Sequence, residues 1–193
     1  MKDTAWCFRL FFGFILSAAL LAPGVAFAGG LSYSYVEAGV DVMELDAPAG
    51  DGDGVRLAGS LASGDTLFLF GSFTDLSIDL DAGGKLDMER WSVGLGSHTG
   101  IADRLDVVAK VGYELEDVSG GGSSSGISAA FGVRAALLVE LAGGLTYRYL
   151  DSDGSLATHV RAVIPLAPLF SFFVGAEASD DEAIYRGGLR LSF

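Results

Sequence analysis

Two histidines are the side chains best suited to acid–base chemistry in this chain, whose single cysteine, Cys7, lies close to the N-terminus. His159 follows Asp151 and Asp153, and a histidine oriented by a carboxylate is a common general base. His98 is predicted to lie in a turn. A hydrogen-bonded histidine inside the fold is the simpler interpretation of His159, and no nucleophile elbow, P-loop or zinc-ligand cluster is present. We therefore predict no enzyme activity, no catalytic residue, no metal site and no cofactor.

Charged residues form a second pattern, because they recur at alternate positions opposite apolar ones. The predicted inward-facing set has nine basic residues and six acidic residues: Arg56, Arg90, Arg104, Lys110, Arg134, Arg148, Arg161, Arg186, Arg190, Glu37, Asp41, Asp106, Glu114, Glu140 and Glu177. An unpaired buried charge costs several kcal/mol, so we expect these groups to pair with one another or to keep water. The alternative is a charge ladder that conducts a solute, and the excess of three basic groups would then favour anions.

Alternating segments must position these charges, and ten of them follow residue 28. They are 31–42, 55–63, 67–73, 88–97, 105–115, 127–137, 141–149, 156–164, 169–178 and 184–193. The spacing of about 16 residues fits strands of roughly 9–11 residues with short connections. The sequence therefore predicts an all-β, antiparallel up-and-down barrel of about ten strands, with eight as the alternative.

The connections between these segments alternate in character. Those after odd-numbered segments are rich in Asp, Gly and Ser, such as 47–52 and 119–126, whereas those between, such as 63–65 and 165–168, are mostly shorter. Longer loops on one side are typical of outer-membrane barrels with both termini in the periplasm. The long set carries 16 carboxylates: Glu44, Asp46, Asp51, Asp53, Asp75, Asp79, Asp81, Asp87, Glu89, Glu116, Asp117, Asp151, Asp153, Asp180, Asp181 and Glu182. We expect a solvated acidic rim, with weak divalent-cation bridging to lipopolysaccharide as the alternative.

The first 28 residues have the order of a secretory signal peptide. Lys2 and Arg9 precede the apolar run 10–22, and Ala26-Phe27-Ala28 supplies a cleavage site. We therefore predict a signal peptide over 1–28 and a barrel domain over 29–193. The domain has 165 residues, with 10 Lys and Arg against 24 Asp and Glu, because Lys2, Arg9 and Asp3 fall in the leader. Such an acidic chain lacks the basic surface that nucleic acid requires.

The end of the chain separates a membrane barrel from a soluble sandwich, which alternates in the same way. Tyr185, Gly187, Leu189, Leu191 and Phe193 share one face, and Phe193 is the last residue. A terminal aromatic residue on an alternating strand is the signal read by the outer-membrane assembly machinery of Gram-negative bacteria. We predict outer-membrane lipid, lipopolysaccharide and this machinery as partners of a monomeric barrel.

Three segments resemble a known family. They are 31–39 (LSYSYVEAG), 91–96 (WSVGLG) and 132–134 (GVR). In this order they are similar to the sulfation-dependent quorum-factor family of small outer-membrane barrels. The resemblance implies a non-enzymatic, porin-like outer-membrane protein, shed in vesicles in some cases.

Two functional hypotheses follow from these patterns. The first is a structural or interaction barrel of the cell envelope, with a charged, ion-paired lumen and acidic outer loops. The second is a narrow, porin-like diffusion channel for small solutes. The sequence names no ligand, receptor or solute for either.

Overall fold

The computed structural model describes residues 31–45, 50–80 and 83–193. The predicted signal peptide, Asp46 and Asp81 lie outside the described residues. The described part contains ten strands: β1 (Tyr35–Leu45), β2 (Asp51–Ser63), β3 (Leu67–Asp79), β4 (Lys85–Ala102), β5 (Leu105–Val118), β6 (Gly122–Ala136), β7 (Glu140–Leu150), β8 (Asp153–Pro165), β9 (Phe170–Ala178) and β10 (Glu182–Ser192). Within these ranges, no helix is long and apolar enough to cross a membrane.

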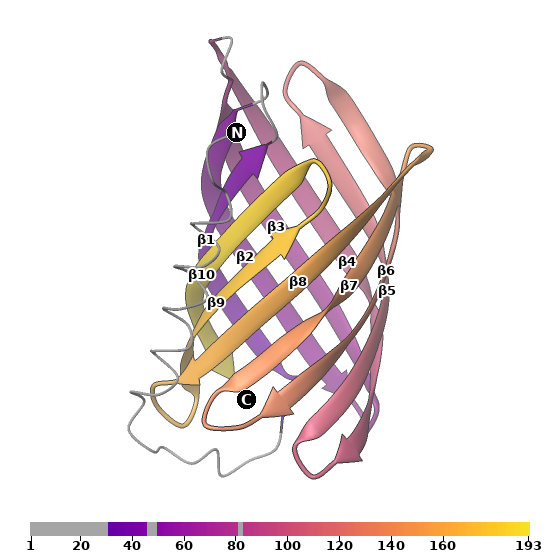
Figure 1. Cartoon of the computed structure of the whole chain (residues 1–193), viewed down its shortest axis with the longest axis vertical. Coiled ribbons are helices and arrows are strands. Elements are labelled where there is room, and N and C mark those ends of the chain that lie inside the picture. The colour runs from indigo at the N-terminus through magenta and orange to yellow at the C-terminus, as the bar shows by residue number, and fades with distance from the viewer. Residues whose placement is uncertain (1–30, 46–49, 81–82) are drawn as a thin grey trace.

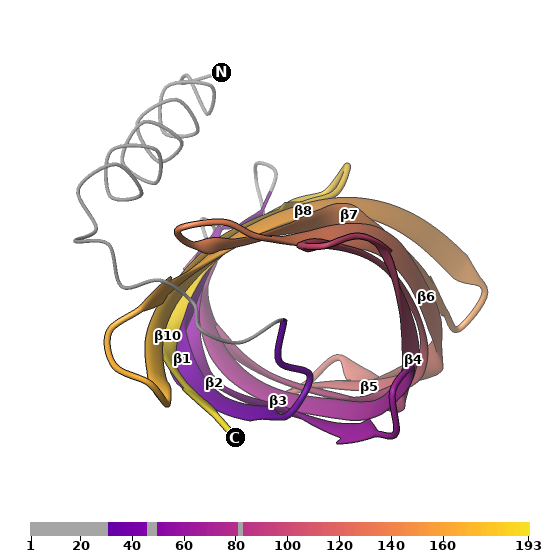
Figure 2. The same cartoon turned by 90° about the horizontal axis from the view of Figure 1, so that it is seen from below.

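The ten strands form one closed antiparallel barrel (Figure 1), which confirms the predicted fold and excludes the eight-stranded alternative. Each strand pairs with the next along the chain, and β1 pairs with β10 from Tyr35↔Ser192 to Leu45↔Glu182. Figure 2 shows the resulting ring of strands. We call the end where β1 begins and β10 ends the proximal end, and the opposite end the distal end.

The two faces of the barrel follow from the two-residue period of a strand. In β5, Val111 and Tyr113 are exposed on the outer surface, whereas Lys110 and Glu114 line the lumen. In β1, Val36 and Val40 are exposed outside. Exposed Leu, Val, Phe, Trp and Tyr side chains occur on the outer surface of every strand from β1 to β10. Such a continuous apolar surface suits lipid and not water.

The apolar surface has a clear distal border on β3, β4 and β5. The rings of Phe73 and Trp91 pack with centroids 4.3 Å apart on neighbouring strands. Two residues further toward the distal end, Asp75 pairs with Glu89, and Glu89 pairs with Asp117. Carboxylates directly opposite one another destabilise a sheet unless water screens them. The aromatic pair therefore marks an interface, with lipid on its proximal side and water on its distal side.

The predicted difference in loop length is wrong, because the strands continue into the polar segments. Residues 119–126 are predicted as a connection, yet β6 begins at Gly122, which pairs with Val118. Only Asp151, Asp180 and Asp181 of the described rim carboxylates lie between strands. The others lie on strands: Glu44, Asp51, Asp53, Asp75, Asp79, Asp87, Glu89, Glu116, Asp117, Asp153 and Glu182. Main-chain hydrogen bonds to the neighbouring strand extend the ladder, and they need no apolar side chain.

The position of the apolar surface predicts different effects on stability for an arginine introduced at two outward-facing sites. Val111→Arg places a charge on the lipid side, and we expect it to cost about 2–4 kcal/mol near the bilayer centre. Ser77→Arg lies on the distal side, where the paired neighbours of Ser77 are Asp53 and Asp87, so we expect no loss of stability. Urea unfolding in lipid vesicles measures both. Equal effects would contradict the placement of the border.

Candidate functional site: the charged lumen

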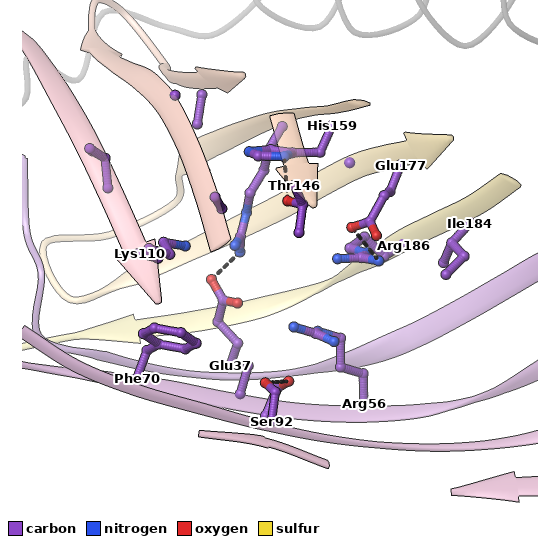
Figure 3. Close-up of a pocket in the computed structure, with 18 of the residues that line it drawn as sticks. Glu37, Arg56, Phe70, Ser92, Lys110, Thr146, His159, Glu177, Ile184 and Arg186 are labelled. Carbon is purple, nitrogen blue, oxygen red and sulfur yellow. Dashed lines mark hydrogen bonds and ion pairs between the residues drawn. The ribbon is translucent and has the colours of Figure 1, made fainter. Parts of the chain in front are cut away.

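The lumen contains a central chamber of about 240 Å³ lined by side chains from all ten strands. Figure 3 shows charged side chains entering it from several walls, including Glu37, Arg56, Lys110 and Arg186. The inward phase of each strand places these groups together although they are far apart in the sequence. The chamber is the candidate functional site because it gathers most of the inward-facing charges.

One set of ion pairs, the Glu37 network, lies on β1, β6, β7, β8 and β10. Glu37 accepts hydrogen bonds from Arg161 and, at 2.6 Å, from Arg190 Nε. Arg190 continues to Glu140, with Nη1 3.3 Å from Oε2, and Arg134 Nη2 lies 2.7 Å from Glu140 Oε1. Only 2% of Glu37 and 3% of Arg190 is exposed. The network therefore ties five strands together through buried, charge-assisted hydrogen bonds.

A second set, the Arg148 network, crosses the lumen between β7, β5, β9 and β10. Arg148 pairs with Glu177, with Glu182 at 3.0 Å and with Glu114 at 3.4 Å. Glu182 is shared with Arg90, whose Nη2 lies 3.5 Å from its carboxylate. One guanidinium thus holds carboxylates from three other strands.

Two arginines extend the Arg148 network toward other walls of the barrel. Arg90 on β4 pairs with Glu116 on β5 at 2.8 Å. Arg186 on β10 lies 3.4 Å from Glu177 on β9 and 4.0 Å from Asp41 on β1. With these pairs the network reaches six of the ten strands.

The inward-facing charges balance, which corrects the predicted excess of three basic groups. Arg104 lies in the connection between β4, which ends at Ala102, and β5, which begins at Leu105. It is exposed and does not line the lumen. Glu116 and Glu182, predicted as rim residues, instead pair inside. The described lumen has eight cations (Arg56, Arg90, Lys110, Arg134, Arg148, Arg161, Arg186 and Arg190) and eight carboxylates (Glu37, Asp41, Asp106, Glu114, Glu116, Glu140, Glu177 and Glu182).

The chain before β1 turns into the proximal mouth of the lumen. Tyr33 is 5% exposed and donates a hydrogen bond to Asp106 on β5 at 2.8 Å. Its ring stacks on His98 of β4 with centroids 3.7 Å apart and packs against Phe68 of β3. The guanidinium of Arg134 on β6 lies over the same ring, with its central carbon 4.2 Å from the ring centroid. Figure 2 shows this start of the described chain inside the ring of strands.

We call residues 31–34 the proximal cap. Besides the contacts of Tyr33, the Ser32 carbonyl accepts a hydrogen bond from Arg134 Nη2 at 3.0 Å. Leu31 packs against the buried cluster of Tyr33, Phe68 and Val108. The cap therefore joins the Glu37 network through Arg134. Tyr33 and Tyr35 both line the chamber, so the first strand keeps its inward phase without a bulge that moves them outward.

An apolar cluster borders the chamber toward the distal end. Met43, Leu76, Ile78, Met88 and Ile184 are each at most 5% exposed and pack together. They come from β1, β3, β4 and β10, and Leu76 and Ile184 also line the chamber. The charged chamber thus lies between two buried apolar clusters, one around Tyr33 of the proximal cap and this one near the distal end.

The structure does not bring His159 together with the carboxylates that precede it in the sequence. His159 faces the lumen, as predicted, and its Nδ1 lies 3.5 Å from Thr146 Oγ1. Asp151 and Asp153 lie at the distal rim instead of beside it. His98 is not in a turn but near the end of β4, where its Nδ1 lies 3.3 Å from Asp106.

Two inward glycines explain how the lumen accommodates its aromatic rings. A Cβ added at Gly94 would lie 2.6 Å from Phe70, and one at Gly96 would lie 2.1 Å from Phe68. Small side chains here therefore make room for the phenylalanines of β3. Among the described residues, no group of three or more His, Cys, Asp and Glu side chains could hold a metal ion.

Comparison with known proteins supports the fold alone. No family model matches the chain, and no curated protein matches it. The chain is similar to a solved structure of the KdgM porin in complex with disordered oligogalacturonate, with 13% identity and a TM-score of 0.52 over 82% of this chain and 99% of that one. It is also similar to the KdgM porin in a second structure, with 15% identity and a TM-score of 0.50 over the same shares. The barrel therefore has the fold of outer-membrane porins.

The Arg148 network predicts a large effect for a single truncation. Arg148→Ala leaves Glu114, Glu177 and Glu182 with fewer cations in a buried site, and breaking a buried ion pair costs roughly 3–5 kcal/mol. Urea unfolding of the refolded barrel in detergent measures the loss. Lys85→Ala is the matched control, because Lys85 pairs with Asp79 on the exposed surface and should have no measurable effect. Equal stability of the two variants would show that the network does not hold the lumen together.

Proposed function

We propose that the protein is a non-enzymatic outer-membrane barrel with a closed lumen, whose role is structural or depends on interactions at its surface. The buried ion pairs carry this proposal, because they join the walls of the barrel across the space that a solute would need. The proximal cap supports it, since Tyr33 packs inside the mouth against β3, β4 and β5. The charge of the whole lumen also supports it, because its eight carboxylates offset its eight cations along the path that an ion would take.

The proposed location is the bacterial outer membrane, reached by a precursor whose residues 1–28 are removed. The apolar outer surface and the porin fold support a membrane location. We propose that the proximal end faces the periplasm, which places the carboxylates of the distal strand ends outside, near lipopolysaccharide. Phe193 continues the exposed outer face of β10 beyond Leu189 and Leu191, as expected of a signal for the assembly machinery.

We also propose, from the three resembling segments, membership of the quorum-factor family of small outer-membrane barrels. The segment 31–39 contains the cap residue Tyr33 and the network residue Glu37, so the most distinctive part of the resemblance coincides with the closed part of the lumen. We propose that the barrel is a monomer, since β1 and β10 pair along their whole length and leave no edge for another chain.

A narrow channel is the second candidate, and the chamber is the observation that favours it. About 240 Å³ is accessible between the two ends, and the chamber lining is more basic than the whole lumen. The KdgM porin, which has a similar fold, is known in complex with disordered oligogalacturonate. By analogy, a channel of this kind would pass small anionic solutes.

Conductance in planar bilayers separates the two candidates. We expect the wild-type protein to give no steady porin-sized current and only small, brief events. Tyr33→Ala removes the ring that fills the proximal mouth, so events should become larger and longer. Tyr113→Ala, which removes an exposed outer ring, is the control and should leave the current unchanged. A large, steady and ion-selective current from the wild-type protein would overturn the closed barrel and establish the channel.

A further inference from the structure

In the described part of the lumen, two cations have no carboxylate within ion-pair distance. Among the described residues, Lys110 has no acidic group within ion-pair distance, and its nearest described interaction is with the ring of Phe70, 5.5 Å from Nζ. Arg56 donates to the hydroxyl of Thr74 at 3.2 Å and likewise has no acidic partner within that distance. The described ion pairs and hydrogen bonds of the eight lumen carboxylates are with other groups, and Asp41 has only the 4.0 Å ion pair with Arg186, so the overall balance of charge hides a local excess.

The strands beside these two cations explain why they stay unpaired. Lys110 pairs in register with Gly96 on β4 and Ala130 on β6. Arg56 pairs in register with Gly39 on β1 and Thr74 on β3. None of these neighbours carries a charge, so neither cation has a carboxylate beside it on an adjacent strand.

The space in front of the two cations is the central chamber. Lys110 and Arg56 both line it, and Figure 3 shows both side chains pointing into it. The buried Nε atoms of Arg161 and Arg186, whose side chains line the same chamber, have no hydrogen-bond partner in the described structure. The chamber therefore presents two unpaired cations and further unused donors to a volume large enough for several water molecules.

We propose that the chamber binds a small oxyanion, a phosphate or carboxylate group, between Lys110 and Arg56. A buried cation without a counter-charge is costly, and an oxyanion supplies both the charge and several acceptor oxygens. Arginine provides a planar pair of donors for such a group, and lysine provides a compact charge. Water alone could solvate the two cations but would not neutralise them.

This site does not depend on whether the lumen conducts. A barrel that is closed on average still exchanges a small ion when its cap opens, and an anion present during folding is enclosed as the strands close. A steady wild-type current would overturn the closed barrel and leave the anion site intact. Absence of anion binding would overturn the site and leave the closed barrel intact.

Binding of radiolabelled inorganic phosphate to the refolded barrel tests the site. The protein is refolded in neutral detergent with phosphate present and examined by equilibrium dialysis, with chloride keeping the ionic strength constant. We expect saturable binding of one phosphate per chain. Lys110→Met and Arg56→Gln should each weaken binding about tenfold, which corresponds to the loss of one charged hydrogen bond.

Two controls keep the test decisive. Lys85→Met removes an exposed cation and should leave phosphate binding unchanged, whereas Lys110→Arg keeps the lumen charge and should retain it. Faster gel migration of unheated samples shows which variants have folded. The proposal is wrong if the folded wild-type protein binds no phosphate, or if Lys85→Met weakens binding as much as Lys110→Met does.

Discussion

Pairing of β1 with β10 is the interaction on which the rest of the structure depends. Because these strands pair from Tyr35↔Ser192 to Leu45↔Glu182, the sheet has no free edge, and every strand has a partner on both sides. A closed sheet in lipid satisfies its main-chain hydrogen bonds without water. Closure also separates an outside from an inside, and this separation gives the alternating sequence two different environments.

Many of the charged side chains inside the barrel are buried, and a buried charge is costly unless it is paired. Side chains such as Arg148 and Glu37 each contact two or more partners from different strands, so a single group serves several walls. Each buried ion pair offsets the desolvation cost of its two charges. This cost is larger than the stabilisation that most exposed ion pairs provide. The same logic makes Lys110 and Arg56 notable, because the networks leave these two cations without a carboxylate.

Apolar contacts complete the lumen where the ion pairs end. Inside the barrel, Tyr33 at the proximal mouth and Met43 near the distal end are almost fully buried. The cap also links closure to electrostatics, since Arg134 contacts both the Tyr33 ring and Glu140. Loss of the cap would therefore disturb the ion pairs as well as open the mouth.

The sequence by itself determined the type of barrel, the order of its strands and the face of most side chains, because strand period and membrane thickness act on each segment separately, whereas the structure decided between ten strands and eight. The alternation with apolar neighbours such as Val133 and Ala178 was enough to predict that Arg134 and Glu177 point inward. It misplaced His98 and the start of β6, because polar residues carry no apolar signal and only the adjacent strand shows that the ladder continues.

Only the tertiary structure decided which charges meet. Glu37 and Arg161 lie 124 positions apart and contact each other because barrel closure and strand tilt bring β1 and β8 to the same level. The inward turn of Tyr33 onto His98 and the lack of an acidic partner for Lys110 are likewise decided by neighbours on other strands. Periodicity fixes the direction of a side chain, but contact depends on register and on three-dimensional distance.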